Sequence, residues 1–90
     1  MKKHILCLGD SNTHGYCADP NDCADHGIRF NEEERWTCRL QKALGEEYLV
    51  TEEGLSGRTT VFVDPIHESM DALSVIYALL KSHEVIDLLI

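Results

Sequence analysis

The chain has 90 residues, of which 43% are hydrophobic and 27% charged, a composition typical of one small globular domain. Its formal net charge of -8 argues against a nucleic-acid partner and against an anionic membrane surface, because both require clustered Lys and Arg. No run approaches the roughly 18 apolar residues of a membrane-spanning helix, and the apolar run at residues 5–8 is too short for a secretory signal. We therefore expect no membrane association and a cytoplasmic location.

The first predicted element is a buried strand over residues 4–8, a short apolar run that stops at the turn formers of residues 9–12. Residues 13–30 are rich in Gly, Asp and Asn and show little periodicity, which predicts a long loop with one helical turn after Ser11. Loops of this length inside a compact domain are usually functional or disordered. Because the loop follows the turn at residues 9–12, we expect it to form a pocket wall.

A helix is predicted next, ending at Gly45, which suits a C-terminal stop. Asn31 suits the N-cap, and the three glutamates of residues 32–34 place negative charge in the first turn, where the helix dipole favours it. The spacing of its apolar residues predicts one apolar face, formed by Trp36, Leu40, Ala43 and Leu44.

The remaining elements are predicted to be a strand at residues 48–51, an extended connector at 61–63, a helix at 69–82 and a strand at 85–90. The order strand, helix, strand, helix, strand favours a parallel sheet with helices on its faces. The second helix is expected to bury one face, formed by Met70, Leu73, Tyr77 and Leu80.

The four cysteines are expected to be free thiols, the default in a chain without a secretion signal. Cys7 lies inside an apolar run and is expected to be a small core residue. Cys17, Cys23 and His26 could be drawn as metal ligands, but they lack the close Cys-x2-Cys pair that makes zinc sites recognisable. We therefore expect no metal.

Two loops are expected at the carboxyl ends of the first two strands, where open parallel sheets bind their ligands. The first carries Ser11 at a strand-to-helix turn, which exposes its hydroxyl and directs its backbone N–H toward a bound oxyanion. The second carries Gly57, whose N–H could approach the same oxygen without a side chain in the way. The alternative is that Ser11 only caps a helix and Gly57 only forms a turn.

Residues 5–15, ILCLGDSNTHG, resemble the first sequence block of the GDSL/SGNH hydrolases, and residues 53–60, EGLSGRTT, resemble the second. Arg35-Trp36 and Asp64-Pro65 are similar to the arylesterase-like branch of that family. The resemblance implies a flavodoxin-like three-layer α/β/α fold, incomplete in this chain.

The same resemblance implies roles for individual residues. Ser11 matches the nucleophile and one oxyanion N–H, and Gly57 matches the second oxyanion N–H. Asp10 and Asn12 would support the nucleophile, although Asn12 stands where the family's naming motif has leucine. His14 is expected as a pocket-wall or surface residue, because its sequence position alone does not make it a base. Arg58 would either touch a polar acyl or leaving group or lie in solvent.

The family's further blocks, with an Asn oxyanion donor and an Asp/His pair, are not among these residues. We therefore expect residues 1–90 to be the N-terminal part of one SGNH domain, inactive alone. The complete protein would be a serine esterase that acts on short acyl or acetyl esters without a cofactor. Its partner would be a small-molecule ester, and homo-oligomerisation stays open.

Two alternatives remain. The chain could be a non-catalytic binding module, or inactive fragment, of the same fold. It could also be a nucleotide- or flavin-binding domain, but its first loop lacks the Gly-rich phosphate fingerprint.

Overall fold

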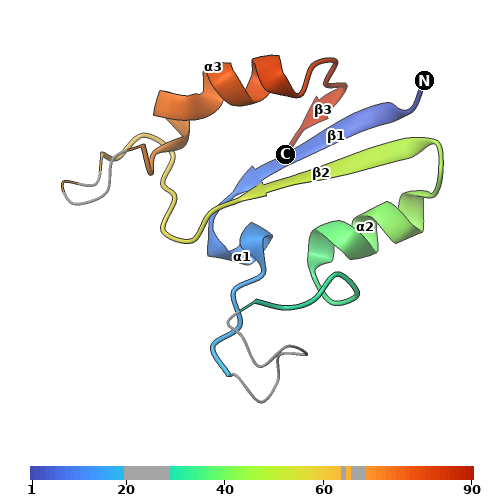
Figure 1. The fold of residues 1–90 in the computed structure, drawn as a ribbon, viewed down its shortest axis with the longest axis horizontal. Helices are drawn as coiled ribbons and strands as arrows, with labels where there is room; N and C mark the ends of the chain where they lie inside the picture. The colour runs from blue at the N-terminus through green and yellow to red at the C-terminus, as the bar shows by residue number, and fades with distance from the viewer. Residues whose placement is uncertain (20–28, 64, 66–68) are drawn as a thin grey trace.

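The computed structural model describes residues 1–19, 29–63, 65 and 69–90. Strands and helices follow one another in the predicted order, and the short helix after the first strand is the helical turn predicted there (Figure 1). In chain order the elements are β1 Lys3–Gly9, α1 Ser11–His14, α2 Trp36–Leu44, β2 Tyr48–Gly54, α3 Ala72–Ser82 and β3 Leu88–Leu89.

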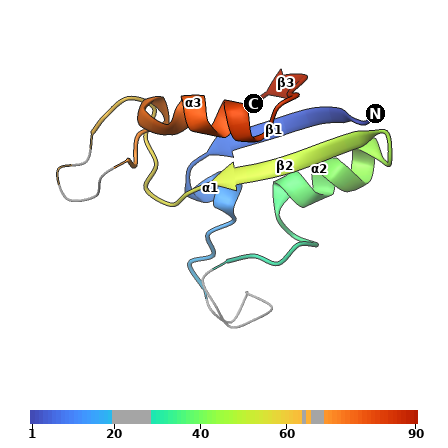
Figure 2. The same cartoon turned by 45° about the horizontal axis from the view of Figure 1, so that its top comes forward.

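The described strands form one parallel sheet in the order β2-β1-β3, so β1 is the central strand. The register pairs Gly9 with Gly54 at the end of β1 and β2, and Leu6 with Leu89 on the other side. Helices α2 and α3 lie on opposite sides of the sheet (Figure 2). This arrangement confirms the predicted α/β class, as a three-stranded part of a three-layer α/β/α fold.

Few apolar side chains are fully buried. The apolar core consists of Ile5, Leu6 and Cys7 of the central strand together with Cys17. The radius of gyration is 14.2 Å, larger than the roughly 12 Å expected for a compact domain of this length. The molecule is also thin, with extents of 40 × 35 × 15 Å. Much of the apolar surface of β3 and α3 therefore faces solvent.

Helix α2 begins four residues later than the sequence predicts, with Arg35 instead of Asn31 at the N-cap. Asn31 Oδ1 accepts a hydrogen bond from the Glu33 N–H at 3.0 Å, and this bond closes a turn before the helix rather than capping it. The buried side of α2 includes Thr37, whereas Trp36 is 39% exposed. The predicted apolar face is therefore wrong at Trp36. The predicted stop at Gly45 is confirmed, with the Gly45 N–H bonded to the Gln41 carbonyl.

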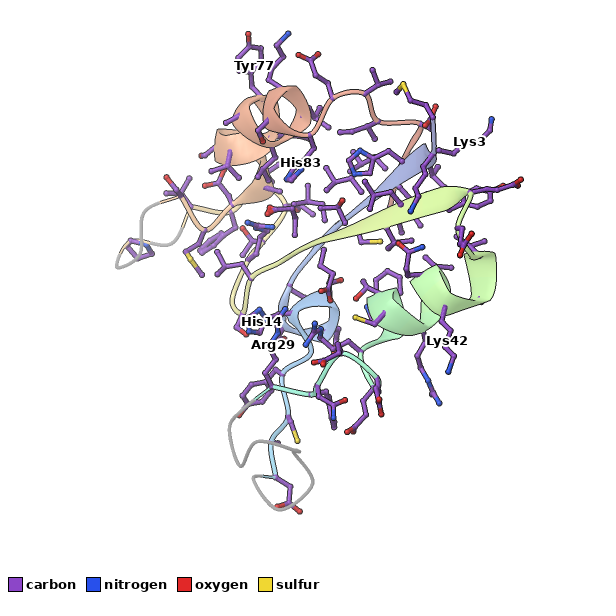
Figure 3. The ribbon with its side chains drawn as sticks, turned by 45° about the vertical axis from the view of Figure 1, so that its right-hand side comes forward. Lys3, His14, Arg29, Lys42, Tyr77 and His83 are labelled. Carbon is purple, nitrogen blue, oxygen red and sulfur yellow. The ribbon has the colours of Figure 1, made fainter. Side chains whose placement is uncertain are left out.

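The apolar face predicted for the second helix is only partly covered in α3. Leu73 is 64% exposed and Tyr77 is 76% exposed, and Tyr77 points away from the sheet (Figure 3). Met70 and Leu80 of the predicted face are partly buried, as are Val75, Ile76 and Leu79. The expectation that Leu73 and Tyr77 belong to a buried face is therefore wrong in this chain.

The third strand is shorter than predicted, and the residues before it are held to the central strand by one histidine. The Asp87 N–H donates to the His4 carbonyl at 2.8 Å, and the His4 N–H donates to Asp87 Oδ2 at 2.7 Å. The His4 ring bonds the Val85 carbonyl through Nδ1 (3.1 Å) and the Thr51 hydroxyl through Nε2 (2.7 Å). His4 therefore links β1, β2 and the approach to β3.

The prediction that all cysteines are free is wrong for Cys17, which is disulfide-bonded. Cys7 and Cys38 are free. Cys23 and His26, the other two residues considered as metal ligands, lie outside the described residues. In the part of the chain that the structure describes, no helix is both long and apolar enough to span a bilayer. The cytoplasmic location remains a prediction, and a disulfide is unusual in a reducing compartment.

Candidate active site

The loops that follow β1 and β2 leave the sheet side by side. Gly9 and Gly54 are paired residues in the parallel register, and the Leu55 N–H donates to the Gly9 carbonyl at 3.1 Å. The first loop leads directly into Ser11, and the second leads into Gly57. The sequence-predicted nucleophile and oxyanion residue are thus carried by adjacent loops at the carboxyl edge of the sheet, where ligands of open α/β sheets bind.

Two glycines let α1 approach the strand ends closely. A Cβ on Gly54 would lie 2.2 Å from the backbone nitrogen of His14. A Cβ on Gly9 would lie 2.2 Å from Thr13 Oγ1. Only residues without a side chain fit at either position without moving α1. The close approach fixes where Ser11, the first residue of α1, stands.

Ser11 begins α1, a single helical turn. Asp10 precedes it and accepts a hydrogen bond from the Asn12 N–H at 3.0 Å, and Gly15 closes the turn in a left-handed conformation with φ +93°. This hydrogen bond closes the turn around Ser11, and the supporting roles of Asp10 and Asn12 stay predictions. Among the described residues, the Ser11 N–H has no acceptor. It therefore remains able to donate to a bound oxygen.

Gly57 lies in the turn that follows β2. The Arg58 N–H donates to the Leu55 carbonyl at 3.0 Å, and Gly57 has φ +86°, a conformation that favours glycine. The Gly57 N–H also has no acceptor within the described ranges. Both N–H groups expected in an oxyanion hole are thus unused by the protein. This is a requirement for that role, and the roles themselves stay predictions.

A cavity of about 300 Å³ lies beside the end of β1. Its lining combines a carboxylate, a guanidinium and two threonines with the backbone of the strand end. The lining residues are Leu8, Gly9, Asp10, Arg58, Thr59, Thr60 and Ala72. Of the residues predicted for the site, the structure therefore brings Asp10 and Arg58 to one cavity.

His14 is held by the end of β2. Its Nδ1 bonds the Gly54 carbonyl at 3.2 Å, so that nitrogen must carry a proton. The carbonyl of His14 accepts a hydrogen bond from Arg29 Nε at 2.7 Å, and the two residues lie together in Figure 3. These contacts give His14 a structural role at the loop base. They orient the imidazole ring, and the interpretation of His14 as a wall residue stays a prediction.

Sequence reasoning missed an ion pair that ties α2 to β2 just behind the site. Arg35 donates from Nε and Nη2 to the two carboxylate oxygens of Glu52, at 2.8 and 3.2 Å, and Thr37 donates to the same carboxylate. Burial raises the pKa of Glu52, but the hydrogen bonds from Arg35 and Thr37 and the charge of Arg35 outweigh burial and lower it. Glu52 lies two residues before Gly54.

The pairing of Arg35 with Glu52 could not be read from the chain, because the partners are separated by 17 residues. Arg35 itself was singled out only through the resemblance of Arg35-Trp36 to the arylesterase-like branch.

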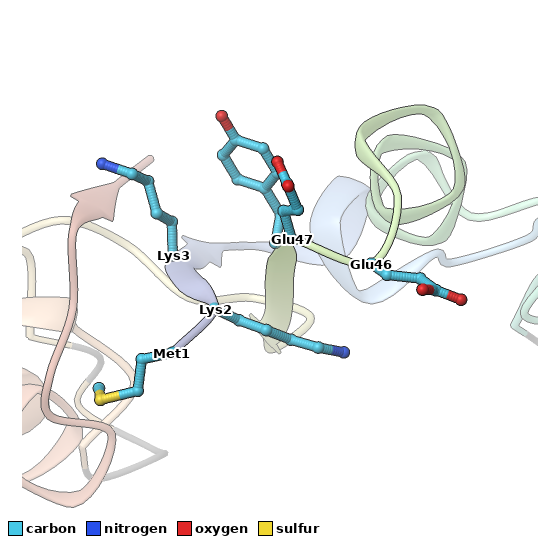
Figure 4. Close-up of a pocket in the computed structure, with 6 residues that line it drawn as sticks. Met1, Lys2, Lys3, Glu46 and Glu47 are labelled. Carbon is cyan, nitrogen blue, oxygen red and sulfur yellow. The ribbon is translucent and has the colours of Figure 1, made fainter.

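Another hollow lies at the opposite end of the sheet (Figure 4). It is formed by the N-terminal residues and the connection into β2, and lies at the amino ends of the strands, away from Ser11. Its lining residues are Met1, Lys2, Lys3, Glu46, Glu47 and Tyr48. Its position speaks against a catalytic role. Among the described residues, no group of three or more His, Cys, Asp or Glu side chains could hold a metal ion.

Solved structures of esterases are similar to the chain over nearly its whole length. An aryl esterase from M. smegmatis is 38% identical with a TM-score of 0.85, and the match covers 97% of this chain and 40% of the esterase. A carbohydrate acetylesterase from Sinorhizobium meliloti is 34% identical with a TM-score of 0.85, covering 98% of this chain and 40% of that one. A second carbohydrate acetylesterase family member from S. meliloti is 40% identical with a TM-score of 0.82, covering 97% and 38%.

The resemblance to the GDSL/SGNH hydrolases is confirmed. The chain has the α/β fold of these esterases and spans about two fifths of their length. No protein-family model matches the sequence, and no curated protein matches it significantly. The assignment to the GDSL/SGNH fold therefore rests on the solved structures and on the two sequence blocks at residues 5–15 and 53–60.

Proposed function

We propose that Ser11 is the acyl-accepting nucleophile of a carboxylic-ester hydrolase, and that residues 1–90 form the N-terminal part of its single SGNH domain. The observation that best supports this is the pairing of Gly9 with Gly54, which sets the Ser11 and Gly57 loops side by side. The similarity to esterases at 34–40% identity supports the same reaction class.

In the proposed reaction, Ser11 Oγ forms a bond to the ester carbonyl carbon while its proton passes to a general base. The carbonyl oxygen becomes an oxyanion and accepts hydrogen bonds from the unused N–H groups of Ser11 and Gly57. The C–O bond to the alcohol then breaks, and the alcohol leaves with a proton. Water hydrolyses the resulting acyl-enzyme and regenerates Ser11.

The general base is expected from the Asp/His pair that the family resemblance implies outside residues 1–90. The described histidine nearest to Ser11 in sequence, His14, has its Nδ1 bonded to Gly54. A base must lie within hydrogen-bond reach of the nucleophile, about 2.6–3.2 Å. The proposed complete site combines Ser11 and Gly57 with that Asp/His pair.

The substrate class is proposed from the neighbours and from the cavity. The similar proteins are an aryl esterase and carbohydrate acetylesterases, which points to esters of small acyl groups. The cavity beside Asp10 has a partly polar lining and a volume of about 300 Å³. A short acyl or acetyl ester, without any cofactor, is the substrate that we propose.

Hydrolysis of 4-nitrophenyl acetate by the full-length protein tests this function. Ser11→Ala should lower kcat by roughly 10³-fold or more, because the nucleophile is lost. Ser56→Ala is the matched control, since Ser56 lies in the exposed turn after β2 and should leave the rate unchanged. A protein whose hydrolysis survives Ser11→Ala does not use this serine. A full-length protein without hydrolysis would favour the non-catalytic binding module.

A further inference from the structure

Arg35 and Arg58 each donate a hydrogen bond from Nη1 to a backbone carbonyl, but they differ in what the Nε–Nη2 edge of the guanidinium binds. Arg35 donates from Nη1 to the Phe30 carbonyl at 2.9 Å, and its Nε–Nη2 edge holds the Glu52 carboxylate. Arg58 donates from Nη1 to the Glu53 carbonyl at 2.6 Å. Its Nε is buried, and neither Nε nor Nη2 has an acceptor among the described residues.

A buried guanidinium N–H without an acceptor is unfavourable, and such atoms are uncommon in folded proteins. The Nε–Nη2 edge of arginine presents two parallel N–H groups, which match the two oxygens of a carboxylate. Arg35 shows that this chain uses the edge in that way. Arg58 has the same backbone anchor with an empty edge, which a carboxylate would fit.

Arg58 lines the cavity beside the end of β1, where a ligand could supply that carboxylate. The other charged group of this cavity is Asp10, which is exposed to solvent and accepts a hydrogen bond from the Asn12 N–H. Within the described residues, no ion pair joins Asp10 to Arg58. Solvent screens the repulsion between Asp10 and an anionic ligand.

We propose that Arg58 binds the carboxylate of a small-molecule ligand in this cavity through its Nε–Nη2 edge. Because Nε lies below the accessible surface, binding requires a small rotation of the guanidinium about its anchor on the Glu53 carbonyl. Binding also gives the buried N–H an acceptor. The extension to catalysis, a preference for esters that carry a carboxylate, rests on the proposed function of Ser11, whereas binding itself does not.

Side-chain NMR of the ¹⁵N-labelled full-length protein tests the proposal, with sodium acetate as probe and sodium chloride at equal ionic strength as reference. The Arg58 Nε–H signal should shift saturably in acetate alone, and its exchange with water should slow by roughly tenfold. Arg39 is the internal control, because its side chain is exposed and should respond alike to both salts. Arg35 reports folding through its bond to Glu52.

Two variants sharpen the test. Arg58→Lys keeps the charge but loses the paired N–H groups, so the saturable acetate response of the neighbouring Gly9 and Thr60 amides should disappear. Asp10→Asn should leave the Arg58 signal of the acetate-free protein unchanged. If Asp10→Asn instead moves the Arg58 Nε–H signal of the acetate-free protein, Asp10 already binds the Nε–Nη2 edge of Arg58. That result would overturn the proposed ligand site.

With the Arg35 signal at its folded position, equal responses of Arg58 and Arg39 to acetate would also overturn the proposal. None of these results depends on Ser11. Loss of Ser11-dependent hydrolysis and loss of acetate binding are therefore separate outcomes.

Discussion

Gly9 and Gly54 lie opposite each other at the last paired position of β1 and β2, and α1 lies so close to both that neither has room for a side chain. The nearest atoms to an added Cβ would be Thr13 Oγ1 for Gly9 and the backbone nitrogen of His14 for Gly54, each at 2.2 Å. The position of Ser11 therefore depends on two residues that carry no chemistry of their own.

Replacing Gly54 tests this packing. Gly54→Ala is expected to lower the free energy of unfolding by roughly 1–3 kcal/mol, because the backbone of α1 must move to admit the methyl group. Urea denaturation followed by circular dichroism measures the loss. The amide signals of Thr13 and His14 should shift in the same variant.

Gly45→Ala is the matched control for that variant. A Cβ on Gly45 meets nothing within 4 Å, but its φ of +82° makes alanine unfavourable by roughly 1–2 kcal/mol. It should therefore destabilise the chain without moving the Thr13 and His14 amides. Unchanged stability of Gly54→Ala, with those amides in place, would contradict the close approach of α1.

The ion pair behind the site predicts a pH dependence. Because the pKa of Glu52 is lowered in the folded protein, its contribution to stability is present above its ordinary value of 4.5 and is lost as the pH falls below it. Glu52→Gln should cost about 1 kcal/mol at neutral pH, a modest value because both partners keep some solvent contact. The same substitution should also reduce the slope with which the free energy of unfolding falls at acidic pH.

Urea denaturation from neutral to acidic pH measures both effects, and Glu47→Gln serves as a control with an exposed carboxylate. Asp71, whose pKa is lowered chiefly by its hydrogen bond from the Ser74 hydroxyl, will leave a residual slope. If the free energy of unfolding falls as steeply at acidic pH in Glu52→Gln as in the wild type, the Arg35–Glu52 ion pair is not a source of the pH dependence.

The two free cysteines should differ in reactivity. Burial, with a smaller effect of the Glu52 carboxylate, raises the pKa of Cys7, so little of its thiol is ionised. Cys38 is only partly buried. Iodoacetamide should therefore alkylate Cys38 at least about tenfold faster than Cys7 in the folded protein. Peptide mass spectrometry measures the two alkylation rates, which should become equal when urea unfolds the protein. Equal rates without urea would argue against a buried central strand.

The isolated chain should be a poor esterase. The Asp/His pair implied by the family resemblance is not among its residues. Residues 1–90 are thus expected to hydrolyse 4-nitrophenyl acetate no faster than their own Ser11→Ala variant. Turnover well above that variant would mean that a resident group acts as the base.

The sequence predicts the order of elements and the parallel sheet well, because the apolar run at residues 4–8 and the alternation of element types are strong local signals. The start of α2 is missed for a physical reason. Acidic residues after Asn31 suit a first helical turn and a separate turn alike, and the structure forms the separate turn, with Asn31 bonded to Glu33. Arg35 then pairs with a distant residue, Glu52.

The face of α3 could not be predicted from periodicity. Its sequence, ALSVIYALLKS, is apolar on nearly every side, so several faces satisfy the same spacing. Of the residues predicted to share one face, Leu73 and Tyr77 are exposed, whereas Met70 and Leu80 are partly buried.

Some residues of the candidate site could be predicted from the sequence, and others could be found only in the structure. The turn residues Ser11 and Gly57 are identified by the family-like blocks, and the structure places both at the carboxyl edge of the sheet. Gly54 belongs to the second block, but its role as the contact of α1 depends on a neighbour 40 residues away. The empty edge of Arg58 is likewise visible only in three dimensions.

The intact mass of the natural protein after treatment with a serine-reactive fluorophosphonate tests the central claim most directly. We predict a protein larger than the 10.2 kDa of this chain that carries a single adduct on Ser11, and no adduct in Ser11→Ala. A natural protein near 10.2 kDa that takes no label would contradict the esterase and favour a binding module. An adduct that persists in Ser11→Ala would contradict the assignment of Ser11 as the nucleophile.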